Sequence, residues 1–216
     1  SISIKGLASE DEIRLETTNL TQNDITCLAP IWSGDLPDDR LHALISVSLD
    51  WKHPNLSRGI PEVYRLTEKP PEGLQNAVNV LWNTLIIQGI TRKGCTKTAA
   101  GLFSNLMATM IKGLRDYDGF FPYFQVGDGR PLGKANTISG LAPLRLFLEI
   151  AGIRILTPNR VALWGQNPFP WPLEVTWQGL SLTKEDNHTC LTFPDGATCS
   201  HTGSTPMLIT PEIGGA

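Results

Sequence analysis

The sequence predicts a mainly α protein with a small C-terminal antiparallel β unit. Apolar residues recur every three or four positions through residues 72–89 and 93–115, which is the spacing of buried amphipathic helices. After Gly152 the period of the apolar residues changes to two, which is typical of β-strands. The chain has 216 residues, of which 41% are hydrophobic, so it is long enough to bury a sizeable core.

Four helices are expected, over residues 37–49, 72–89, 93–115 and 139–151. The first begins near Pro37, followed by Asp38 and Asp39, whose carboxylates favour a helix N-terminus. Gly89 and Gly152 stand where a C-terminal glycine is expected. These helices are predicted to pack as antiparallel hairpins.

The residues after Gly152 are expected to form a hairpin over 153–156 and 160–164, followed by strands over 173–182 and 188–193. The chain is therefore divided into a strand-like lead-in (1–36), a helical unit (37–152), an antiparallel β unit (153–205) and a tail (206–216).

Charge and motifs exclude several classes of function. The net charge of −3 and the absence of a basic stripe argue against nucleic acid as a partner. Residues 73–91 carry no charge, but their amides make a membrane span unfavourable. No nucleotide-binding motif is present and the four histidines share no ligand spacing, so neither cofactor nor metal is expected. No secretory signal opens the chain, which leaves a cytoplasmic location or secretion after processing open.

Four cysteines are widely spaced, and Cys190 and Cys199 flank a Pro-Asp-Gly turn. A two-residue turn would place these two cysteines opposite each other. A bulge at Gly196 would instead place Cys190 opposite Ser200. We expect reduced thiols.

The candidate functional residues are carboxylates that lie among aromatic side chains. The connection 50–71 supplies Glu62 and Asp50 as candidate catalytic groups, with Trp51, His53 and Tyr64 as candidate substrate contacts. Cleavage of a glycosidic bond needs two carboxyl groups, and sugar rings pack on aromatic faces. The alternative is that these carboxylates are merely solvated and that the aromatic residues anchor the loop.

The connection 116–136 adds Tyr123 and Asp128 to the candidate substrate contacts. Both long connections leave helices that run in the same direction if successive helices are antiparallel. The sequence therefore predicts that the two connections meet at one end of the helical unit and form a sugar-binding cleft there.

Several short motifs resemble those of one enzyme group. They are Gly-Ile-Pro at 59–61, a helix end at 82–89, a glycine-rich loop at 128–133, Ser-Gly-Leu-Ala-Pro at 139–143 and a proline-rich segment at 168–172. Together they resemble the C-terminal half of a six-hairpin (α/α)6-barrel glycoside hydrolase, the group of trehalases, processing glucosidases and debranching-type glucosidases. The likeness covers about residues 45–195.

The resemblance implies a partial (α/α)6 barrel that belongs to an inverting exo-glycosidase and binds an oligosaccharide or glycoside. Twelve helices form such a barrel and four are expected here, so an N-terminal half or a partner chain would complete it and supply the general acid. Residues 121–125 lack the glutamate common in this group, so the base is absent, unneeded or displaced, and Glu62, Asp118 and Asp128 are the candidates for a displaced base. The alternatives are a non-catalytic carbohydrate-binding or interaction domain and a purely structural helical module.

Overall fold

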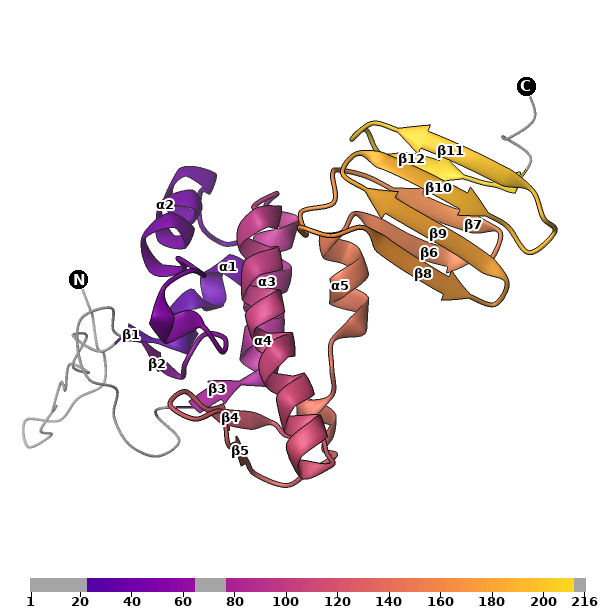
Figure 1. Cartoon of the computed structure of the whole chain (residues 1–216). Coiled ribbons are helices and arrows are strands. Elements are labelled where there is room, and N and C mark those ends of the chain that lie inside the picture. The colour runs from indigo at the N-terminus through magenta and orange to yellow at the C-terminus, as the bar shows by residue number, and fades with distance from the viewer. Residues whose placement is uncertain (1–22, 65–76, 212–216) are drawn as a thin grey trace, which may run out of the picture.

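The computed structural model describes residues 23–64 and 77–211, and its architecture is mixed rather than mainly helical (Figure 1). Helical residues make up 39% of this part of the chain and strand residues 25%. The prediction of a mainly α protein is therefore wrong. The β unit is larger than expected, and the two long connections contribute strands of their own.

Five α-helices form within the described ranges: α1 (Ala29–Ser33), α2 (Asp38–Ser48), α3 (Val80–Arg92), α4 (Thr96–Tyr117) and α5 (Leu144–Ile150). Helix α4 is the longest, and it lies beside α3 at the centre of the helical part (Figure 1). Helices α1 and α5 both pack against α3. Gly89 of α3 lies so close to the Ile31 carbonyl of α1 that a Cβ atom would be 2.5 Å from this oxygen.

Two predicted helices are shorter than their periodicity suggests. Residues 77–79 form strand β3 because they pair with β4, and α3 therefore begins at Val80 rather than near residue 72. Helix α5 begins at Leu144 because Pro143 has no backbone N–H and disfavours a helical residue before it. The residues before Pro143 form a separate 3₁₀ turn, Ile138–Gly140.

Short strands hold the ends of the two long connections. β1 (Asn23–Asp24) pairs with β2 (Val63–Tyr64), and β3 (Ala77–Asn79), β4 (Tyr123–Gln125) and β5 (Pro131–Leu132) form an antiparallel sheet in that order. Pro61 adds a bridge to Val78 on the outer side of β3. Residues 58–64 of the first connection therefore meet the second connection near the start of α3 and the end of α4. The first connection nevertheless begins at the other end of α4, beside Gly101, whereas the order of the helices predicts that both connections leave from the same end.

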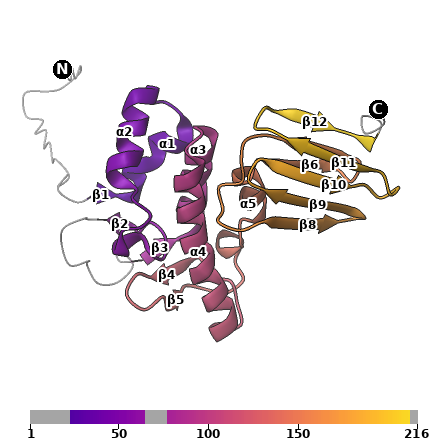
Figure 2. The ribbon, with the colours of Figure 1, turned by 45° about the horizontal axis from the view of Figure 1, so that its top comes forward.

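The C-terminal part is a β-sandwich of two antiparallel sheets that lie face to face (Figure 2). One sheet has the order β12-β7-β6 and the other β11-β10-β9-β8. The strands are β6 (Ile153–Thr157), β7 (Arg160–Leu163), β8 (Leu173–Trp177), β9 (Leu180–Glu185), β10 (His188–Thr192), β11 (Thr198–Thr202) and β12 (Met207–Ile209). β12 forms within the segment expected to be a tail, and it pairs with β7.

The β8–β9 hairpin of the sandwich is not evident from the sequence. Residues 173–182 were expected to form one strand, but β8 and β9 are separated by a turn at Gln178 and Gly179, both with positive φ. Two successive residues with positive φ are typical of a type I′ hairpin turn, which glutamine seldom occupies. Across the turn between β10 and β11, Cys190 lies opposite Ser200 and Leu191 opposite Cys199, so the register follows the bulged alternative and both thiols are free.

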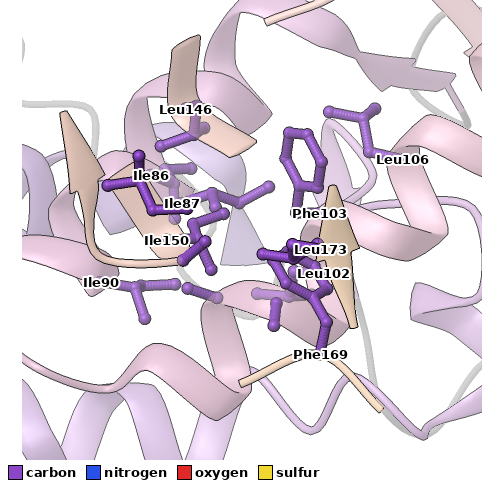
Figure 3. Packing of buried hydrophobic residues seen from close by; sticks show 14 of the residues in the cluster. Ile86, Ile87, Ile90, Leu102, Phe103, Leu106, Leu146, Ile150, Phe169 and Leu173 are labelled. Atoms are coloured by element: carbon purple, nitrogen blue, oxygen red, sulfur yellow. The ribbon is translucent and has the colours of Figure 1, made fainter. Parts of the chain in front are cut away.

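One continuous core joins the helical part to the sandwich. Ile87 of α3, Phe103 of α4 and Ile150 of α5 pack towards Phe169 and Leu173 at the entrance to the sandwich (Figure 3). The Phe169 ring lies 5.1 Å from the Phe147 ring of α5 and 6.4 Å from the Phe103 ring. This aromatic contact anchors the segment between β7 and β8 to the helices.

Exposed apolar side chains of α4 and α5 gather in one groove. Ile111 is 59% exposed and Leu144 is 66% exposed, and both line an apolar groove of about 410 Å³ together with Phe147 and Trp171. On helix α3, Ile86, Ile87 and Ile90 are fully buried, whereas Leu81 is 50% exposed.

Lys184 is an unusual buried cation within the sandwich. Its side chain is 2% exposed, and its Nζ donates to the Trp164 carbonyl oxygen at 3.0 Å. Burial lowers the pKa of this ammonium group from 10.5 to about 8. The amine is therefore less readily protonated in the folded protein than in the unfolded chain.

Stability is expected to rise as the pH increases from about 8 to 10.5. In this window the unfolded chain keeps the proton of Lys184 while the folded protein has lost it, so raising the pH increases the free energy of unfolding, by about 3 kcal/mol over the whole window. Urea unfolding of Lys184→Met at several pH values should show this rise abolished. The control Lys97→Met, at an exposed position of α4, should keep the rise in stability with pH. An equal dependence of the free energy of unfolding on pH in the two variants would contradict the assignment of this rise to Lys184.

Candidate functional site

The first long connection lies along α4 and is fixed near the start of this helix. The Trp51 ring covers Gly101 so closely that any Cβ atom there would overlap with the ring. Asn105 donates from Nδ2 to the carbonyl oxygens of Trp51 (2.9 Å) and Leu56 (3.0 Å). These two positions, about one turn apart on α4, hold residues 51–56 in place.

The second connection is fixed near the other end of α4. The Phe124 ring of β4 lies against Gly113, where a Cβ atom would be 2.5 Å from Cε1 of the ring. Gly101 and Gly113 are 12 residues apart, which corresponds to about 18 Å along an α-helix. Trp51 and Phe124 are therefore held at well-separated levels of the same helix.

Arg58 connects the two long connections directly. Its Nε donates to the Val126 carbonyl oxygen at 2.8 Å and its Nη2 to the Gly127 carbonyl oxygen at 3.2 Å. Gly129 has a φ of +75°, and a Cβ atom there would lie 2.9 Å from Nη1 of Arg58. The loop between β4 and β5 is thus shaped around this guanidinium group.

Glu62, Asn79 and Tyr123 come together beside this loop, and we call them the Glu62 cluster. The Glu62 carboxylate accepts a hydrogen bond at Oε1 from Asn79 Nδ2 at 2.8 Å. Asn79 is also the N-cap of α3, since its Oδ1 accepts from the Trp82 amide at 3.2 Å. Tyr123 lies directly opposite Asn79 in the antiparallel pair β3–β4, so both side chains lie on the same face of the sheet.

The backbone around the Glu62 cluster is firmly held. The Glu62 amide donates to the Ala77 carbonyl oxygen at 2.7 Å, and its own carbonyl oxygen accepts from the Ile25 amide at 2.8 Å. The partial positive charge at the N-terminus of α3 favours a carboxylate bound to the capping residue. All three side chains are partly exposed, so a ligand can reach them.

Three of the predicted site residues lie away from the Glu62 cluster, near Gly101. Trp51 packs there, and Asp50 Oδ1 accepts from the Lys52 amide at 3.1 Å. His53 Nδ1 accepts from the Asn55 amide at 3.2 Å and so caps a 3₁₀ turn. About 18 Å of helix separates this group from Phe124, so Asp50 and Glu62 do not form a pair of carboxylates across one bond.

The remaining predicted residues have more local roles. Asp128 Oδ1 accepts from the Arg130 amide at 2.8 Å within the loop that surrounds Arg58. Asp118 is exposed and ends α4 with a φ of +53°. The backbone of Tyr64 pairs with Asn23 in the β1–β2 ladder.

Two functional candidates were missed in the sequence. Asn79 lies inside the segment 72–89 that is expected to be one helix, although an asparagine before an apolar periodic segment is a typical N-cap signal. Arg58 precedes the Gly-Ile-Pro motif, and no local pattern marks its bond to a loop almost 70 residues later.

The described part of the chain contains no group of three or more histidine, cysteine, aspartate or glutamate side chains that could hold a metal ion. No helix among the described residues is both long and apolar enough to span a membrane. No protein family, curated protein or solved structure matches this chain.

The role of Asn79 can be tested by removing the side-chain amide that donates to Glu62 while keeping a side-chain oxygen that caps α3. Asn79→Asp keeps an N-cap acceptor but places a second carboxylate against Glu62, whereas Asn79→Ser keeps an acceptor without this charge. At neutral pH and low salt, Asn79→Asp should be less stable than Asn79→Ser by about 1 kcal/mol, and added salt should narrow the difference. Equal stability of the two variants at low salt, measured by urea unfolding, would disprove the contact.

Proposed function

We propose that this chain binds carbohydrate at the Glu62 cluster. The observation that carries the proposal is the hydrogen bond between Glu62 and Asn79 beside Tyr123 on a small, firmly held sheet. A carboxylate accepts hydrogen bonds from sugar hydroxyls, an amide both donates and accepts, and an aromatic ring packs against the C–H face of a pyranose. These three groups together are the usual composition of a sugar-binding site.

Binding is favoured over hydrolysis by this chain alone. Hydrolysis needs a second carboxyl group about 5 to 10 Å from the first, on the other side of the scissile bond. Asp50, the expected partner of Glu62, is exposed and lies next to Trp51 near Gly101 instead. In the catalytic alternative, Glu62 would be the base or would contact sugar hydroxyls, and a general acid would come from outside the described residues.

The proposal can be tested by measuring binding of neutral oligosaccharides to the full chain with a glycan array and then by calorimetry. A ligand identified in this way should lose at least tenfold in affinity with Glu62→Gln and with Tyr123→Ala, because each variant removes one recognition group. Matched controls are Glu174→Gln on β8 and Tyr117→Ala at the end of α4, both exposed and outside the cluster.

Three outcomes decide the proposal. Loss of affinity in the cluster variants with normal binding in the controls supports it. Absence of binding to any neutral glycan, or equal binding by all four variants, contradicts it. Turnover of an aryl glycoside that disappears in Glu62→Gln would support the catalytic alternative instead.

A further inference from the structure

A second, larger cleft lies between the helical part and the β-sandwich. It has a volume of about 950 Å³, near the upper limit of small-molecule sites. Its charged side chains are Arg92 at the end of α3, Arg145 and Glu149 on α5, and Arg154 on β6. Arg92 lies more than 50 positions before the other three in the sequence, and the fold brings all four to one cleft.

Glu149, the one acidic residue that lines this cleft, is already paired with neighbouring side chains. Glu149 accepts from Arg145 Nε at 3.1 Å and from Gln88 Nε2 at 3.4 Å. Arg92 and Arg154, in contrast, have neither an ion pair nor a side-chain hydrogen bond within residues 23–64 and 77–211. The cleft therefore has two unpaired guanidinium groups in a chain whose net charge is −3.

The neutral lining of the cleft suits a polyhydroxylated ligand. The half-buried Trp164 side chain offers an apolar surface, and Gln166, Thr91 and Ser204 offer amide and hydroxyl groups. Guanidinium groups bind carboxylate, sulfate or phosphate oxygens with two parallel hydrogen bonds, which an ammonium group cannot do.

We propose that this cleft binds an acidic saccharide and that Arg92 and Arg154 hold its carboxylate or sulfate groups. The cleft lies at the opposite end of α3 from Asn79, and the 13 residues between Asn79 and Arg92 correspond to about 20 Å. It is therefore a site separate from the Glu62 cluster and does not depend on the function proposed there.

The test is calorimetric titration of the full chain with four probes: the trisaccharide of galacturonic acid, the trisaccharide of galactose, a sulfated disaccharide and inorganic phosphate. The double variant Arg92→Gln/Arg154→Gln removes the proposed contacts. The control Arg40→Gln/Arg160→Gln changes the net charge equally at two exposed arginines outside the cleft. Thermal unfolding verifies that both variants fold.

We expect at least one of the two acidic saccharides to bind at least tenfold more tightly than the galactose trisaccharide. This preference should disappear in Arg92→Gln/Arg154→Gln and remain in the control. The relative affinities of the two acidic saccharides show whether the cleft prefers carboxylate or sulfate. Equal binding of acidic and neutral saccharides, an equal loss in the control, binding of phosphate as tight as that of the saccharides, or no binding of any probe would each overturn the proposal.

Discussion

The arrangement of the helical part depends on two positions of α4 that have no side chain. Gly101 receives the Trp51 ring and Gly113 receives the Phe124 ring. Because a Cβ atom at either position would overlap with the ring, each glycine lets one long connection lie directly on the helix. Glycine in a helix interior costs about 0.5 to 1 kcal/mol relative to alanine, and the burial of a large aromatic side chain offsets this cost.

This packing separates the candidate residues into two groups. Trp51 and its neighbours lie near the start of α4, whereas Phe124 holds β4 near the other end and so positions Tyr123 beside Asn79. The Glu62 carboxylate joins the second group through Asn79, which also caps α3. A single asparagine thus links the start of a helix, a small sheet and a carboxylate, and this arrangement is the basis of the proposed carbohydrate site.

Local signals in the sequence predict much of the fold. Helices α2 and α4 and the β6–β7 hairpin agree with their periodicity within a few residues, because each has one consistent apolar face. The sequence of residues 77–79 is equally compatible with a helix and a strand. These residues form a strand because they pair with β4, which lies more than 40 residues later in the chain. Likewise, Arg92 and Arg154 form no motif in the sequence, since only the packing of α3 against α5 and of α5 against β6 brings them to one cleft.

The contact between Gly113 and Phe124 is tested most directly by a double-mutant cycle with Gly113→Ala and Phe124→Leu, measured by urea unfolding. Leucine removes the ring atoms Cε1 and Cζ, which are the two nearest to a Cβ atom at position 113. Gly113→Ala should destabilise the wild-type protein by about 2 kcal/mol and should be neutral or stabilising in the Phe124→Leu background. Equal costs of Gly113→Ala in both backgrounds would contradict the view that this bare position of α4 holds the second connection in place.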